Sequence, residues 1–220
     1  MHKLLPLLLL LLFSCEQKPT INKEKLAKEL DSIMIVDQQY RSQIQDAQQA
    51  YGWDSPEMQE LLQKQNELDE SNLKRIQEII DLVDGYPGKS LVGISSSKVA
   101  FFVLQHAPDS IQEQYYDLII QAASEGELDK RLAAMYQDRY LMYRGDPQLF
   151  GTQIRTEYEL DSITGERIES TYLWPISDTT NIDSVRMWNG LGPLEEYLNG
   201  FGISRWEQKS AFWNIFKHTA

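Results

Sequence analysis

The spacing of apolar residues predicts that the chain is mainly helical. Over residues 22–50 the apolar positions recur at alternating steps of three and four, which is the spacing of one face of an α-helix. Residues 54–57 (DSPE) combine a capping side chain, a proline and an acid, and predict the start of a second helix that runs to about Asp84. Because the link between the two helices is short, we expect them to pack as an antiparallel hairpin.

Capping signals and glycine or proline breaks predict three further helices in the next part of the chain. They cover about residues 95–107, 110–124 and 128–144. Together with the first two, they predict a bundle of about five helices.

The apolar period changes from helical spacing to strict alternation after residue 150. Residues 152–160 (TQIRTEYEL) have the pattern of a β-strand, and residues 168–174 supply the returning strand of a hairpin. Two short helices near residues 182–189 and 193–199 follow, each ending before a glycine. The predicted fold class is therefore mainly α: a helical bundle, then a β-hairpin, then two short helices.

The first residues predict export and lipid attachment. An apolar run from Leu4 to Phe13 is too short to span a bilayer, which takes about 20 residues, and it follows a short basic start as in a secretory signal. The run ends LFSC, which resembles a bacterial lipobox and implies cleavage before Cys15 and lipid attachment there. The alternative is an ordinary signal peptide that contains a cysteine. Cys15 is the only cysteine of the chain, so no internal disulfide can form.

These features predict a signal peptide over residues 1–14, a tether over residues 15–24 and a single helical domain over residues 25–220. The predicted location is the bacterial cell envelope, with the lipid anchoring the protein to a membrane; the outer membrane is favoured over the inner one. A net charge of −12 argues against nucleic acid as a partner. The sequence predicts no metal ion and no cofactor, because one cysteine and three histidines cannot supply a structural zinc site.

Three polar residues occupy positions where the helical spacing demands an apolar residue. They are Asp37 in the first helix, His106 in the third and Arg139 in the fifth. Burial of a lone charge costs several kcal/mol, so we expect the three to meet in one cluster or to line one cleft. Arg41, one helical turn after Asp37, can also pair with it. A shift of one residue in the phase of the fifth helix would instead bring Asp138 inward.

Several short motifs resemble an uncharacterised bacterial lipoprotein domain family of unknown function. The family pattern comprises D-Q-x-x-R, Q-H-A, D-R and P-Q-x-Y-G-T-Q, and the chain has DQQYR (37–41), QHA (105–107), DR (138–139) and PQLFGTQ (147–153). Phenylalanine replaces the tyrosine of the last motif. The resemblance adds Gln105, Gln148 and Gln153 to the candidate residues and implies no particular reaction.

Three functional hypotheses follow from these residues. In the first, the domain binds a small or extended anionic ligand in a polar cleft through Arg139, Arg41, Gln105, Gln148 and Gln153, together with the histidine. In the second, it is a hydrolase-type enzyme in which His106 is the general acid or base, Asp37 or Asp138 orients it and Arg139 stabilises negative charge. In the third, the cluster is a buried structural network in a scaffold protein.

Overall fold

The computed structural model describes residues 20–160, 163–164 and 167–203. The predicted signal peptide, Cys15 and the first part of the predicted tether lie outside the described residues. The described part is mainly helical, with one antiparallel two-stranded hairpin and two short helices after it, which confirms the predicted fold class.

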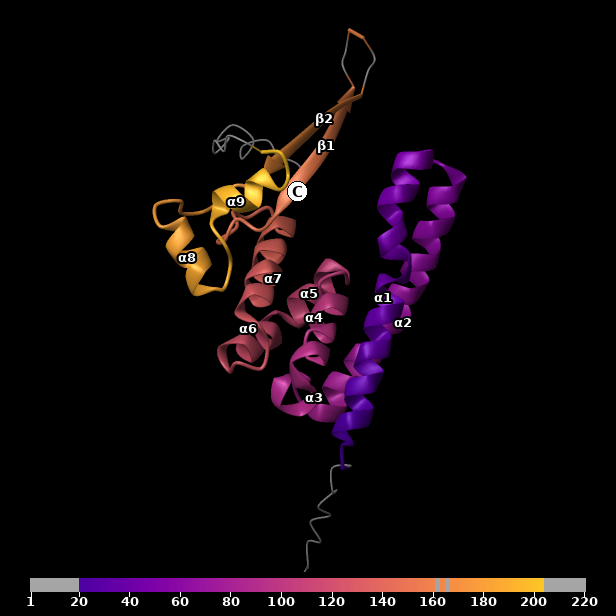
Figure 1. The fold of residues 1–220 in the computed structure, drawn as a ribbon, viewed down its shortest axis with the longest axis vertical. Helices are drawn as coiled ribbons and strands as arrows, with labels where there is room; N and C mark the ends of the chain where they lie inside the picture. Colours follow the sequence, from indigo (N-terminus) through magenta and orange to yellow (C-terminus); the bar gives the residue numbers. More distant parts are fainter. Residues whose placement is uncertain (1–19, 161–162, 165–166, 204–220) are drawn as a thin grey trace, which may run out of the picture.

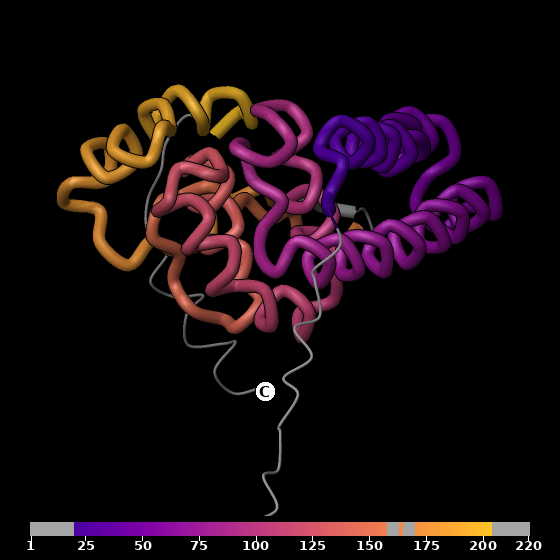
Figure 2. Tube along the Cα trace, turned by 90° about the horizontal axis from the view of Figure 1, so that it is seen from below, coloured from indigo at the N-terminus to yellow at the C-terminus, as the bar shows by residue number. Residues whose placement is uncertain are grey.

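Helices α1 (Lys23–Tyr51) and α2 (Pro56–Val83) form the predicted antiparallel hairpin, which lies along one side of the molecule (Figures 1 and 2). Each helix begins at a side-chain cap, since Asn22 accepts a hydrogen bond from the backbone N–H of Lys25 at 2.9 Å and Ser55 accepts one from Met58 at 3.1 Å. Pro56 occupies the first helical position of α2, where its missing N–H has no intrahelical partner to lose.

Five shorter helices, α3 to α7, lie between this hairpin and the C-terminal elements (Figures 1 and 2). Their bounds are α3 Lys89–Ser96, α4 Val99–Leu104, α5 Asp109–Gln114, α6 Tyr116–Ser124 and α7 Lys130–Tyr143. The sequence did not predict α3, which contains a kink at Gly93, where φ is +85°. The single helix predicted over residues 110–124 is divided at Tyr115, whose φ of −99° and ψ of 5° depart from helical values.

The main apolar core joins the lower half of the hairpin to the short helices. Leu26, Leu30 and Ile33 of α1 pack with buried side chains of α2, α4, α6 and α7, and Asp37 is the next buried residue of α1. The residues that fill the centre of this core include Ile76, Phe101, Leu104, Ile119 and Tyr136. On α1 the apolar core thus ends at Asp37, the first of the three polar residues that interrupt the apolar spacing of the sequence.

The C-terminal elements form a second, smaller packing unit. Strands β1 (Ile154–Leu160) and β2 (Arg167–Leu173) pair antiparallel with Ile154 opposite Leu173, and helices α8 (Ile182–Trp188) and α9 (Leu194–Asn199) follow. The buried apolar residues that pack together in this unit are Leu173, Ile176, Leu194 and Leu198. Among the described helices, none is both long enough and apolar enough to cross a bilayer.

Candidate functional site

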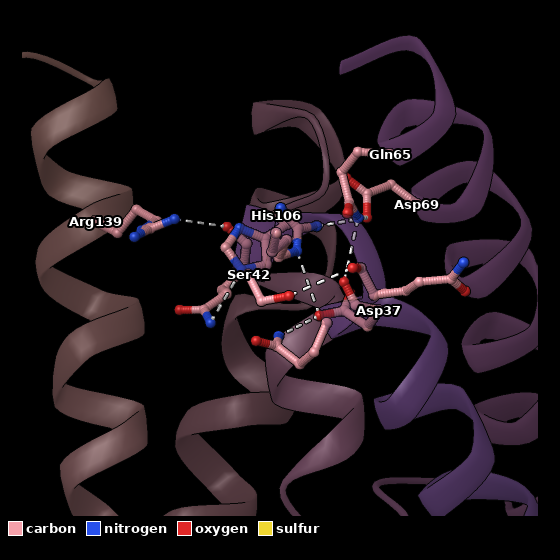
Figure 3. Close-up of polar contacts among 10 residues, drawn as sticks. Asp37, Ser42, Gln65, Asp69, His106 and Arg139 are labelled. Carbon is pink, nitrogen blue, oxygen red and sulfur yellow. Dashed lines mark hydrogen bonds and ion pairs between the residues drawn. The ribbon is translucent and has the colours of Figure 1, made fainter. Parts of the chain in front are cut away.

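A polar network joins α1 to α2 where the apolar core ends (Figure 3). Asp37 is 1% exposed, and its Oδ2 accepts hydrogen bonds from Gln38 Nε2 at 2.7 Å and from Arg41 Nε at 3.3 Å. Arg41 also forms an ion pair with Asp69 of α2. Gln65 of α2 donates to the backbone oxygen of Asp37 at 3.3 Å and to Asp69 Oδ1 at 2.8 Å. The arginine is therefore shared between carboxylates of two helices.

Two oxygen atoms of this network have no hydrogen-bond partner among the described residues. They are Oδ1 of Asp37 and Oε1 of Gln65, both fully buried. Burial raises the pKa of the Asp37 carboxyl, while the charge of Arg41 and the hydrogen bonds from Gln38 and Arg41 act in the opposite direction. The network therefore leaves two buried acceptors without a donor from the described residues.

His106 lies in the turn that follows α4, and two other helices hold this turn in place. Gln112 of α5 donates through Nε2 to the backbone oxygens of Gln105, at 3.3 Å, and Ala107, at 2.8 Å. Arg139 of α7 donates through Nη1 to the same oxygen of Gln105 at 3.2 Å. These bonds satisfy carbonyl groups that a helix end leaves without intrahelical donors. These bonds hold the backbone of the turn that carries His106, and the bond from Arg139 comes from 34 residues away in the sequence.

His106 is held in its neutral form. Burial and, after it, the charges of Arg41 and Arg139 lower the pKa of His106 to about 3. Figure 3 shows Arg139 on one side of His106 and Asp37 and Asp69 on the other. The ring is 3.4 Å from Gln105 Nε2, and among the described residues no carboxylate is hydrogen-bonded to it. The site thus contains a neutral imidazole within the field of two arginines.

A cavity of about 370 Å³ opens beside His106, between α2 and the turn after α4. The residues that line it are Asn66, Asp69, Glu70, Leu73, Val103, His106, Ala107 and Pro108. One wall is therefore polar and acidic, and the other contains the histidine and apolar groups. A volume of this order is within the range of small-molecule sites, about 300–1,000 Å³.

Asp138, the neighbour of Arg139 on α7, anchors the loop over residues 147–153. The side chain is 0% exposed, and its Oδ1 accepts backbone N–H groups of Leu149 at 2.7 Å and Phe150 at 3.0 Å. Its Oδ2 accepts both the backbone N–H and the hydroxyl of Thr152 at 2.9 Å. These bonds occupy the carboxylate, and none joins it to His106 among the described residues. Asp138 therefore holds the loop in place.

Gln148 and Gln153 extend the same set of contacts. Gln148 donates to the backbone oxygens of Gln153, at 3.1 Å, and Trp174, at 2.6 Å, and accepts the backbone N–H of Gln153 at 2.8 Å. Gln153 donates to the backbone oxygen of Met135 at 3.3 Å and to the hydroxyl of Thr152 at 3.1 Å. Both glutamines are buried, and their described bonds go to the loop, α7 and the hairpin rather than to His106.

These networks also contain residues that were not among the candidates drawn from the sequence, including Arg186, Asp69 and Gln65. Arg186 of α8 is 1% exposed and donates to the backbone oxygens of Phe150, Gly151 and Gly192. Gln65 occupies the apolar face of α2, and Asp69 follows one helical turn later on the same face. The helical spacing of α2 could have identified Gln65 and Asp69 from the sequence.

The chain was compared with known protein families, curated proteins and solved structures. Residues 24–203 match the model of a family described as a family of unknown function, DUF6624. The chain belongs to the DUF6624 family. No curated protein and no solved structure matches it. The family match covers every described helix and strand except Lys23, the first residue of α1, so both polar networks belong to the DUF6624 domain.

The DUF6624 domain therefore contains two polar clusters of different character. The cleft cluster consists of Asp37, Arg41, Asp69, His106 and Arg139, and two of these residues, Asp69 and His106, line the cavity. The loop anchor is the second set, and its members are Asp138, Gln148, Thr152, Gln153 and Arg186. All five of its side chains are buried and bonded to the protein, whereas the cleft cluster has partly exposed members. Of the two, the cleft cluster is the one with residues that line the cavity described above.

Proposed function

We propose that the DUF6624 domain binds a small or extended polar ligand with an anionic group beside His106. The observation that supports this most directly is the cavity beside His106, with Arg139 on the other side of this residue from Asp37 and Asp69. Arg41 is shared by two carboxylates, but Arg139 takes part in none of the ion pairs between described residues. Its guanidinium has five N–H donors, and its one described hydrogen bond goes to a backbone oxygen. An anion near it would meet a positive charge that forms no ion pair with a carboxylate of the described residues.

The proposal gives Arg139, Arg41 and His106 the direct contacts with the ligand. Gln105 is a further candidate because its amide nitrogen lies 3.4 Å from the imidazole. A hydrolase-type mechanism has less support, because general acid or base catalysis of this kind uses a group that orients the histidine, and no described carboxylate is bonded to it. A purely structural cluster also has less support, because the histidine borders an open cavity.

In the free protein we expect the NMR signals of the His106 ring to remain those of the neutral form down to about pH 3. Addition of inorganic phosphate or acetate should raise this pKa toward its ordinary value, because the added negative charge offsets the two arginines. Without an anion, the unfolded chain binds the proton more tightly, so stability should fall as the pH drops below about 6.5.

Arg139 of α7 and Arg144, which directly follows this helix, supply a variant and its matched control. Arg139→Gln should abolish the effect of the anion on the His106 signal, whereas Arg144→Gln, which removes a half-exposed charge paired with Glu113, should leave it unchanged. The proposal fails if neither anion shifts the His106 signal, or if both variants respond as the unchanged protein does.

We also propose that the domain is held on a membrane of the bacterial cell envelope by lipid on Cys15. The lipobox-like LFSC and the short apolar run before it support this, together with the polar residues that separate Cys15 from α1. Several acyl chains on one residue hold a folded domain at a bilayer surface, because each buried methylene adds about 0.8 kcal/mol.

Cys15→Ser is expected to move the protein from the membrane fraction to the soluble fraction of fractionated cells. The unchanged protein should incorporate labelled fatty acid, and the variant should not. Ser14→Ala, which leaves the cysteine in place, is the matched control and should remain in the membrane fraction. A variant that still sediments with membranes, beside an unchanged protein without label, would refute the lipid anchor.

A further inference from the structure

Gln112 of α5 holds the turn that carries His106 through hydrogen bonds on both sides of the histidine. Its Nε2 donates to the backbone oxygens of Gln105, at 3.3 Å, and Ala107, at 2.8 Å, and its backbone N–H donates to the oxygen of Pro108 at 3.0 Å. Gln112 is 2% exposed, and hydrogen bonds are stronger where water is excluded. The backbone before and after His106 is therefore fixed to α5 by one residue.

Gln112 also shares an acceptor with Arg139, the arginine that the proposed function assigns to the anion. Arg139 donates through Nη1 to the backbone oxygen of Gln105 at 3.2 Å, and the amide of Gln112 donates to the same oxygen. Tyr136, one helical turn before Arg139 on α7, donates through its hydroxyl to the backbone oxygen of Gln112 at 2.9 Å. Gln112 thus joins the turn that carries His106 to the face of α7 that carries Arg139.

The geometry points to Gln112 as a positioning residue of the anion site: it holds the His106 turn and the Arg139 guanidinium in a fixed relation to each other. This inference rests on the proposed function, because it concerns binding of the same anion. Gln112 is not among the residues that line the cavity, so it acts through the two residues that it positions. Groups that are ordered before binding lose less conformational entropy when the ligand arrives.

An amide suits this role better than a charged side chain. The amide of Gln112 uses its N–H groups on the two backbone oxygens of the turn and carries no charge that would pair with Arg139. A carboxylate at position 112 could not donate to these oxygens and would attract the guanidinium. The positive charge of Arg139 therefore remains available to an anion.

The experiment compares two buried glutamines that both bind backbone oxygens. Gln112→Met keeps most of the volume and removes the amide donors. Gln148→Met is the matched control, because Gln148 is 0% exposed and donates to the backbone oxygens of Gln153 and Trp174, away from the turn. Both variants should lower the melting temperature. Only Gln112→Met should weaken the binding of inorganic phosphate, by about tenfold, in an NMR titration of the His106 signals.

The pH titration of His106 in the free protein gives a second measurement that a loss of stability alone does not change. Gln112→Met should raise the pKa of His106 from about 3 toward its ordinary value of 6.5, because a turn released from α5 exposes the ring to water. Gln148→Met should leave this pKa at about 3. If Gln112→Met does not fold, Gln112→Asn takes its place. It keeps an amide but is one methylene shorter, and both effects should be smaller and of the same sign.

The outcomes separate this inference from the proposed function. If the Gln112 variant binds phosphate as tightly as the unchanged protein, the positioning role is refuted, while the proposed function stands. The same holds if Gln148→Met weakens phosphate binding as much as the Gln112 variant does, because the loss then follows stability. If phosphate does not shift the His106 signal of the unchanged protein, the proposed function fails and the positioning role fails with it.

Discussion

Replacement of Asp138 by alanine is expected to lower the free energy of unfolding by about 3–5 kcal/mol. The carboxylate accepts bonds from three backbone N–H groups, of Leu149, Phe150 and Thr152, and from one hydroxyl, all in a buried setting. Without it, these donors lose their partner and the side chain leaves a cavity. Urea unfolding followed by circular dichroism would measure the loss.

Two further variants make this prediction specific. Asp138→Asn keeps the volume but turns amide N–H groups toward backbone donors, so it should be destabilising by an amount close to that of alanine. Asp117→Ala, which removes an exposed aspartate of α6, should change stability by less than about 0.5 kcal/mol. A loss below about 1 kcal/mol in both Asp138 variants would show that the loop over residues 147–153 does not depend on this carboxylate.

Replacement of Arg186 by alanine is expected to have an effect of similar size, about 3–5 kcal/mol. Its guanidinium donates to the backbone oxygens of Gly192 at 2.7 Å, Phe150 at 2.6 Å and Gly151 at 3.1 Å, and lies over the ring of Tyr197 at 5.2 Å. The variant removes the donor from the buried carbonyl groups of Phe150 and Gly151 and from that of the exposed Gly192. Thermal unfolding should show a clearly lowered melting temperature.

Arg186→Met separates the hydrogen bonds from the packing. Methionine fills most of the volume but donates nothing, so its effect should lie between that of alanine and that of the unchanged protein. Arg144→Ala removes a half-exposed arginine and should cost less than about 1 kcal/mol. If Arg186→Met were as stable as the unchanged protein, the packing of this side chain, and not its bonds to the loop, would hold α8 in place.

Both expected losses of stability arise because the loop anchor holds the loop over residues 147–153, whereas the cleft cluster does not. Asp138 and Arg186 bind the same loop from α7 and α8, and Gly151 between them has a φ of +67°. A Cβ at position 151 would come within 2.9 Å of side-chain atoms of Ile176 and Leu194. A residue with a side chain therefore fits at this position only if these neighbours shift. The PQLFGTQ motif is thus explained by the packing of the C-terminal unit, and the cleft cluster remains the accessible part.

Several elements were determined by the sequence alone, because they depend on local physics. The long helices α1 and α2 follow from apolar positions at helical spacing and from caps at Asn22 and Ser55, and the β-hairpin follows from alternation. The same spacing identified Asp37 as an inward position, and it is buried. Helix α3 and the break at Tyr115 were missed, because the limits of such short helices depend on tertiary contacts more than on propensity.

The partners of the polar residues were decided only by the tertiary structure. On α7, the spacing placed Arg139 inward and gave Asp138 as the alternative for a shift of one residue, which is about 100° around the helix axis. The structure buries Asp138 completely and Arg139 partly, and their partners lie at residues 149–152 and at Gln105. Helical periodicity predicts which way a side chain points, but a hydrogen bond between distant segments forms only when the chain has folded. The tertiary structure alone therefore decided which polar residues join the cleft cluster and which join the loop anchor.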